Sequence, residues 1–321
     1  MSSIQRLRQR LGRLGIASSI ATFALIVFGG IVRITGSGLG CGDDWPLCNG
    51  HLIPPFDVPT MIEYGHRMAA LLVSALVGAV VLLAWIIKRK SRSIESQSLT
   101  GSGSRLWRLA ILAVVLLGTQ ILLGAVTVWL ELPPASVIIH LGTAMLLLAA
   151  LIVLTSETYA TGRVRVSDEA ARLGMWTAVA VLIVILLGAL TANLDAGPAC
   201  QGFPLCNGAL FPNSDGNPLV HAHWAHRVAA YGLVAWCLAL PLVITRRHPS
   251  DPGLSLPART IAIVAVLQLA VGAAMVLTNL PGELRATHVG LGAAVFVAAV
   301  RLAWVARYPA PRQPIDSSSA T

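Results

Sequence analysis

The segment VIIHLGTAMLLLAALIVLT, residues 137–155, contains one histidine and no charged side chain. A run of about 20 apolar residues is long enough to cross the hydrocarbon core of a bilayer as a helix. Backbone groups in lipid must be satisfied within their own segment, so such a run is expected to be helical. We find eight runs of this kind, at about 15–34, 66–87, 109–129, 137–156, 174–193, 223–245, 260–278 and 287–305. The sequence therefore predicts an all-α integral membrane protein with eight transmembrane helices.

The composition supports this class. Of the 321 residues, 55% are hydrophobic and 12% are charged, whereas soluble domains carry about 25% charged residues. The first run follows four arginines and resembles the start of a signal peptide. It is long, however, and lacks a clear small-residue cleavage site, so we expect a retained helix.

The formal net charge of +9 is explained by topology. Lys and Arg cluster at alternate ends of the runs, which predicts that this side is cytoplasmic and that both termini lie inside. Topology accounts for the charge better than nucleic-acid binding does, and we expect no nucleic-acid partner. Four arginines break the rule and lie near the outer ends of runs: Arg33, Arg67, Arg227 and Arg285.

The two halves of the chain resemble each other. EYGHRMAAL at 63–71 matches HWAHRVAAY at 223–231, PLCNG occurs twice, and QILLGAV at 120–126 matches QLAVGAA at 268–274. This repetition predicts two tandem four-helix bundles related by duplication. We assign 1–156 to the N-terminal half, 157–172 to a connecting cytoplasmic loop and 173–321 to the C-terminal half. The inner loop 88–108, rich in Ser, Gly and basic residues, is expected to be a flexible linker.

Four histidines stand at or near the outer ends of the even-numbered runs, two in each half: His66, His140, His226 and His288. A single histidine at such a place is more often an interfacial polar residue. Four at matched depth favour metal ligation, and imidazole is a strong ligand for haem iron in a helix bundle. Zinc or copper is less favoured, because neither half offers a compact His and Cys set.

Three charged residues accompany these histidines. Glu63 precedes His66 by three positions, and its counterpart in the second half is His223. An acid beside one site only favours chemistry in the N-terminal half and haem binding or electron relay in the other; the alternative is an interfacial acid that meets solvent. Arg67 and Arg227 suit haem propionates as partners, although snorkelling toward headgroups explains them equally well.

Two cysteine pairs lie in the outer loops, Cys41 with Cys48 and Cys200 with Cys206. The outer compartment is oxidising, so each pair can form a disulfide. We favour a structural staple for the second pair. The first pair has two aspartates between its members and is the better candidate for a redox-active pair. The remaining Cys237 is expected to pack inside its helix.

Together, several motifs resemble the haem A synthase family, of the CtaA type and its cysteine-containing bacterial branch. They are CGDDWPLCNG at 41–50, EYGHR at 63–67, the lone His140, the repeated PLCNG and HWAHR, and the TH that ends at His288. The resemblance spans nearly all eight runs. It implies a multi-pass oxidoreductase of the bacterial plasma membrane. Its activity would oxidise a methyl group of haem O to a formyl group, making haem A for cytochrome oxidase.

The resemblance also implies which histidines bind which haem. His66 and His140 would hold the substrate haem O and the product haem A in the N-terminal half. His226 and His288 would hold a permanent haem b in the C-terminal half.

Further roles come from the same resemblance. Glu63 would be the functionally important acid, and Cys41 and Cys48 would be the outer pair linked to activity. The implied partners are a haem O synthase and the assembly factors of cytochrome oxidase, within the lipid bilayer. The sequence identifies no electron acceptor.

Three other functions use some of the same features. A dihaem membrane cytochrome b that transfers electrons from quinol needs the four histidines but no substrate haem. A membrane thiol–disulfide exchanger needs only the loop cysteines. A transporter fits duplicated halves, but the centres of the runs are almost wholly apolar.

Overall fold

The computed structural model describes residues 3–92, 97–159, 168–213, 216–249 and 251–307. This part of the chain contains eight α-helices, two short 3-10 turns and no β-strand. The helices are α1 (Ser3–Ile34), α2 (Val58–Arg92), α3 (Gln97–Trp129), α4 (Pro134–Thr158), α5 (Asp168–Asn193), α6 (Pro218–Arg247), α7 (Ser255–Leu277) and α8 (Gly282–Arg307); the turns are η1 (Gly197–Ala199) and η2 (Pro252–Leu254). All eight helices are long and apolar enough to cross a membrane. The predicted all-α multi-span membrane protein is confirmed.

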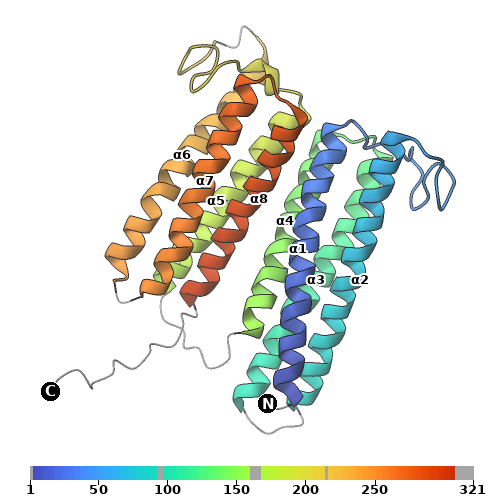
Figure 1. Cartoon of the computed structure of the whole chain (residues 1–321), viewed down its shortest axis with the longest axis vertical. Coiled ribbons are helices and arrows are strands. Elements are labelled where there is room, and N and C mark those ends of the chain that lie inside the picture. Colours follow the sequence, from blue (N-terminus) through green and yellow to red (C-terminus); the bar gives the residue numbers. More distant parts are fainter. Residues whose placement is uncertain (1–2, 93–96, 160–167, 214–215, 250, 308–321) are drawn as a thin grey trace.

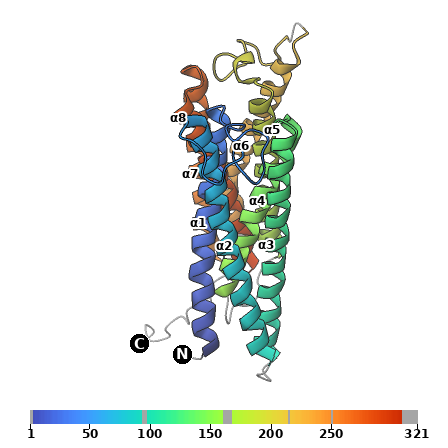
Figure 2. The same cartoon turned by 90° about the vertical axis from the view of Figure 1, so that its right-hand side faces the viewer.

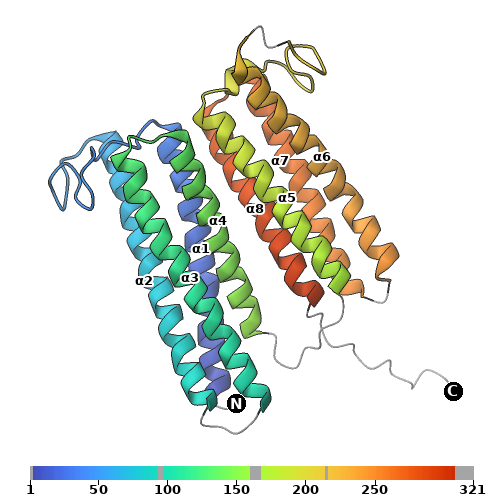
Figure 3. The ribbon, with the colours of Figure 1, turned by 180° about the vertical axis from the view of Figure 1, so that it is seen from behind.

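The helices form two groups of four that stand side by side (Figures 1 and 3). In the first group each helix packs against its chain neighbours, and α4 returns to α1. In the second group α5 to α8 close in the same way, with α8 against α5. Helices α2 and α4 therefore stand across from each other in one group, and α6 and α8 do so in the other. The groups meet where α1 and α4 contact α5 and α8.

Both long loops lie at one end of the molecule (Figures 1 and 2). One connects α1 to α2 and the other connects α5 to α6. The start of α1 and the end of α8 lie at the opposite end. We call the two ends the loop end and the basic end, because the basic clusters lie at the latter.

The helices that run toward the loop end all stop in the same way. A backbone N–H bonds to the carbonyl five residues earlier, next to a residue in the left-handed region, which is a common helix C-cap. The four bonds run from Ser37 to Val32, Leu132 to Thr127, Ala196 to Thr191 and Leu280 to Met275. Prolines then begin α4 and α6, where a missing N–H costs nothing.

The helices extend beyond the apolar runs that predicted them. Helix α1 begins twelve residues before the first run (15 − 3) and α2 begins eight before the second (66 − 58), because polar turns outside the lipid are invisible to a hydropathy window. At the basic end, α2 continues to Arg92 and α3 already begins at Gln97. The expectation of a flexible linker over 88–108 is therefore wrong for most of its length. Its centre, 93–96, and half of the predicted connecting loop 157–172, residues 160–167, lie outside the described residues.

Polar contacts join the two groups at both ends. At the basic end Glu157 on α4 is buried, and its Oε1 accepts a hydrogen bond from Trp304 Nε1 on α8 at 3.2 Å. At the loop end Arg33 on α1 pairs with Asp195, with Nη2 and Oδ1 3.0 Å apart. Between these ends the largest apolar cluster runs from α4 through α5 to α8. The two groups are therefore joined by polar contacts at both ends and by apolar packing between them.

Glycine lets α1 approach α8 closely near the loop end. A Cβ built on Gly30 would lie 3.3 Å from Cγ1 of Val289, which is closer than most side chains tolerate. The neighbouring Gly29 faces the other way, toward α2, where the corresponding atom would lie 3.3 Å from Cε1 of His66. The thin backbone of α1 thus separates His66 from Val289, the residue after His288.

Candidate haem-binding sites

The four predicted ligands occupy equivalent positions in their helices. His66 and His226 are the ninth residues of α2 and α6, and His140 and His288 are the seventh residues of α4 and α8. At 1.5 Å per residue they lie about 12 Å and 9 Å from the start of each helix. They are thus roughly two turns inside the loop end, deeper than the first turn that the apolar runs suggested.

The histidines fall into two pairs. His66 and His140 stand on helices that face each other across the first group, and His226 and His288 do so in the second. Each half of the chain therefore holds one pair of histidines on opposite helices of its group.

A glycine on the preceding helix packs against each histidine ring. A Cβ built on Gly188 would lie 2.8 Å from Cε1 of His226, and one built on Gly272 would lie 3.0 Å from Cε1 of His288. In the N-terminal half these distances are longer. A Cβ built on Gly29 would lie 3.3 Å from Cε1 of His66, and one built on Gly124 would lie 3.5 Å from Cε1 of His140. We call these four residues the glycine seats. The glycine seats of the C-terminal half thus lie closer to their histidine rings than those of the N-terminal half do.

Two neighbouring side chains contact the histidines of the N-terminal pair. Phe28 on α1 meets His66 edge to face, with ring centroids 5.6 Å apart. Gln120 on α3 donates from Nε2 to the carbonyl of His140 at 2.9 Å, which fixes α4 against α3 at the level of the ligand.

The chemistry of the histidines fits a metal macrocycle. Each ring has a buried Nδ1 without a hydrogen-bond partner among the described residues, and such an atom is costly in apolar surroundings. Within the described chain, no group of three or more His, Cys, Asp or Glu could hold a bare metal ion. Two facing imidazoles suffice for haem iron, because the porphyrin supplies the four other ligands.

Arg67 and Arg227 bind the long loops above these sites. Arg67 Nη1 donates to the carbonyls of Asp44 and Leu47. Arg227 Nη1 donates to the carbonyls of Gly202 and Leu205, at 2.8 and 3.0 Å. The accepting residues are equivalent in the two halves (44 + 158 = 202 and 47 + 158 = 205). Each guanidinium thus clamps its loop to the helix that carries a predicted ligand.

The residue one turn before each arginine differs between the halves. Glu63 is buried, and its two oxygens accept from Arg67 Nη2 at 2.7 Å and from the backbone N–H of Cys41 at 2.8 Å. His223 is also buried, and its Nε2 accepts from Arg227 Nε at 3.1 Å. Its Nδ1 therefore carries the proton and donates to the carbonyl of Ala196 at 3.1 Å. The N-terminal clamp is a neutral ion pair, whereas the C-terminal clamp keeps one positive charge.

The structure pairs the loop cysteines as predicted, Cys41 with Cys48 and Cys200 with Cys206. All four of these cysteines are buried. Because Glu63 binds the Cys41 backbone, the first disulfide is linked directly to the helix that carries His66. Cys237 is free and buried within α6.

Sequence reasoning missed the glycine seats and the arginine clamps. Gly124 and Gly272 lie inside the repeated QILLGAV and QLAVGAA motifs, so a shared glycine next to a shared glutamine was the available signal. The carbonyl acceptors of the clamps left no such signal, because a backbone oxygen is present at every position.

Comparison with known proteins identifies the family to which the chain belongs. A family model described as cytochrome oxidase assembly protein, COX15-CtaA, matches residues 12–300. The chain belongs to this family. The match begins in α1 and ends in α8, so it includes both histidine pairs, both long loops and all four glycine seats.

Several members of this family are similar to the chain over most of its length. A protein named Heme A synthase from Alkalihalophilus pseudofirmus is 34% identical over 248 residues, which cover 75% of this chain and 79% of that protein. Proteins of the same name from Bacillus cereus strain G9842 and Bacillus mycoides strain KBAB4 are 30% and 31% identical, and each comparison covers 83% of both chains.

Proposed function

We propose that this chain is a haem A synthase, which oxidises a methyl group of haem O to the formyl group of haem A. Haem O is the substrate between His66 and His140, and haem b is the permanent cofactor between His226 and His288. The observation that carries this proposal is the repeated arrangement of facing histidines, each with a glycine seat and a buried Nδ1 without a partner.

The two halves are suited to different tasks. A substrate must enter and leave, and the looser seats of Gly29 and Gly124 leave His66 and His140 room to adjust. A permanent cofactor gains from rigidity, which the tight seats of the C-terminal pair supply. When bound, haem iron supplies the redox chemistry of each site.

Glu63 is the chain's candidate for proton chemistry in the N-terminal half. It is a buried carboxylate three residues before His66, with Arg67 as its counter-ion. A carboxylate in this position can accept a proton released during oxidation of the substrate, or stabilise positive charge that develops there. Its bond to the Cys41 N–H ties this proton site to the Cys41–Cys48 disulfide, which we propose is the redox-active pair.

Arg67 and Arg227 contribute to haem binding by fixing the loops. Their guanidiniums are already engaged by loop carbonyls. We propose that the clamped loops cover the loop-end edge of each haem. Direct contact between Arg67 or Arg227 and a haem propionate remains a prediction.

The proposed reaction implies partners on both sides. A haem O synthase supplies the substrate, and cytochrome oxidase or its assembly factors receive the product. An electron acceptor must take the electrons removed from the methyl group, and an oxygen donor such as water must supply the oxygen atom of the formyl group.

Extraction of the bound haems tests the proposal. The full chain, expressed with a haem O synthase, is expected to yield haem B together with haem O or haem A. His66→Ala should lose haem O and haem A but keep haem B, and His226→Ala should lose haem B. His221→Ala, on an exposed histidine of α6, is the matched control and should leave both pigments. Two haem B per wild-type chain, with no haem O or A, would instead establish a dihaem cytochrome b.

A further inference from the structure

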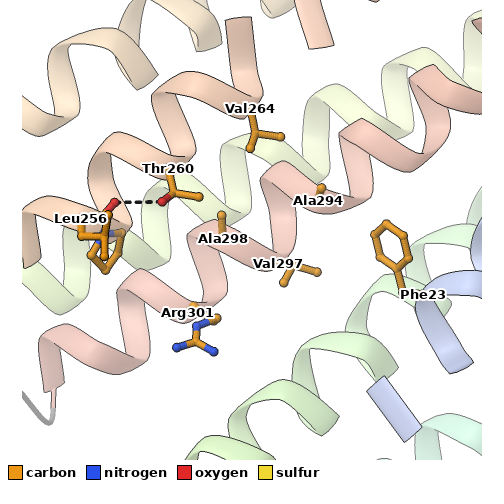
Figure 4. A pocket seen from close by; sticks show the side chains of 9 residues that line it. Phe23, Leu256, Thr260, Val264, Ala294, Val297, Ala298 and Arg301 are labelled. Carbon is orange, nitrogen blue, oxygen red and sulfur yellow. Dashed lines mark hydrogen bonds between the residues drawn. The ribbon is translucent and has the colours of Figure 1, made fainter. Parts of the chain in front are cut away.

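A groove of about 410 Å³ lies between α7 and α8, and none of the four histidines lines it (Figure 4). Leu256, Pro257, Thr260 and Val264 line it from α7, and Ala294, Val297, Ala298 and Arg301 from α8. Phe23 of α1 closes it near the centre of the molecule. The groove therefore begins at the basic end and reaches the place where the two groups of helices meet.

The groove has one polar end and one apolar end. Val264, Ala294 and Phe23 line the apolar end. Arg301 stands at the other end, exposed and without a hydrogen bond or ion pair to any residue in the described part of the chain. The hydroxyl of Thr260 donates to the carbonyl of Leu256 at 3.0 Å. It is therefore already engaged and does not compete with Arg301 for a negatively charged group of a ligand. Among the residues that the structure describes, no acidic side chain lines the groove.

The position of Arg301 matches a lipid headgroup. The basic end is predicted to face the cytoplasm, where the leaflet is rich in anionic lipids. Arg301 and Ala294 are seven residues apart on α8, about 10 Å along the membrane normal. A guanidinium binds phosphate with two parallel hydrogen bonds, and an acyl chain below it would follow the apolar residues inward.

We propose that this groove binds an anionic phospholipid of the inner leaflet, with its phosphate on Arg301 and one acyl chain running between α7 and α8 toward Phe23. The lipid would contact both groups of helices, because Phe23 belongs to α1 and the other lining residues belong to α7 and α8. This inference rests on the predicted orientation in the membrane and is independent of the haem chemistry.

The test uses the full chain in nanodiscs of phosphatidylcholine, with and without phosphatidylglycerol. After extraction with mild detergent, native mass spectrometry counts the retained lipids. The wild type is expected to retain phosphatidylglycerol in about tenfold preference over phosphatidylcholine, the ratio that a difference of about 1.4 kcal/mol produces. Arg301→Gln should abolish the preference, and Ala298→Phe, which fills the groove, should lower retention of both lipids.

Arg259→Gln is the matched control, because Arg259 is exposed on α7 near the same end but does not line the groove. It should behave as the wild type does. Equal preference in Arg301→Gln and the wild type would overturn the proposal, as would an equal loss in Arg259→Gln, which would indicate unspecific attraction to the basic end. Equal retention of phosphatidylcholine and phosphatidylglycerol by the wild type would also overturn it.

Discussion

The carboxylate of Glu63 accepts a hydrogen bond from the backbone N–H of Cys41 at 2.8 Å. This bond joins the helix of His66 to the disulfide loop above it. In the other half His223 reaches the carbonyl of Ala196 instead. A change in the loop therefore reaches a carboxylate directly in the N-terminal half, whereas in the C-terminal half it reaches an imidazole.

Glu63→Gln is expected to lower conversion of haem O by about 100-fold, which is within the usual contribution of general acid–base catalysis. The amide oxygen still accepts from the Cys41 N–H, but the side chain no longer carries charge or takes a proton. The measurement is the ratio of haem A to haem O in extracts, with haem B as an internal check on folding. His223→Gln is the control in the C-terminal half and should leave the ratio unchanged. A wild-type ratio in Glu63→Gln would remove Glu63 from the mechanism.

Cys41→Ala is expected to impair turnover far more than Cys206→Ala. The two disulfides close loops of similar length, with sequence separations of seven and six, so their loss should cost similar stability, about 2–3 kcal/mol. Only the first disulfide contains a cysteine, Cys41, whose backbone N–H donates a hydrogen bond to Glu63. Haem A formation and thermal unfolding should be measured on both variants. Equal losses of turnover would favour a structural role for both pairs.

Gly188→Ala and Gly272→Ala are expected to displace the rings of His226 and His288 and to reduce the haem B content. An added methyl group at Gly188 would lie 2.8 Å from the His226 ring and forces that ring to move, and one at Gly272 would lie 3.0 Å from the His288 ring, which must give by a few tenths of an ångström. Such overpacking costs about 1–3 kcal/mol. Gly29→Ala and Gly124→Ala are the matched variants. Their added methyl groups would lie 3.3 and 3.5 Å from the rings of His66 and His140, so their effect on haem content should be smaller. Absorption spectra and the haem content per chain are the measurements. Equal effects in the two halves would contradict the difference between the seats.

Arg67→Lys and Arg227→Lys are expected to loosen the long loops. A lysine keeps the charge, but its single ammonium cannot span the carbonyls and the Glu63 or His223 side chain together. Limited proteolysis should therefore cut the loop between α1 and α2 in Arg67→Lys, and the loop between α5 and α6 in Arg227→Lys. Arg285→Lys, at the same end of the molecule, is the control. Protection equal to the wild type in both variants would show that the clamps are dispensable.

Much of the architecture could be predicted from the sequence, because lipid forces apolar runs into helices. The histidine pattern was visible for a related reason: a ligand must recur at a fixed place in each helix. Helix ends were less predictable. Asp57, for example, accepts from the Thr60 hydroxyl at 3.1 Å at the start of α2, eight residues before the apolar run begins, and hydropathy does not register such polar turns.

The site was predictable only where side chains carry the chemistry. Glu63, Arg67 and Arg227 were singled out as neighbours of the histidines, but besides the side chain one turn away each of them bonds to backbone atoms of a loop some 20 residues or more away. Such contacts depend on the fold of the loop. The glycine seats could not be predicted because a glycine has no side chain to signal its role: it acts by letting a histidine ring on the next helix pack against its backbone.

The contact between Gly30 and Val289 has an electrical consequence. These residues directly follow Gly29, the seat of His66, and His288, so a direct route between the two histidine pairs crosses α1 and α8 sideways. Moving one elementary charge through the membrane field involves about 2.3 kcal/mol per 100 mV. A charge that passes sideways here stays within the plane of the bilayer and does no work against that field. Exchange between the two sites is therefore expected to be insensitive to the transmembrane voltage.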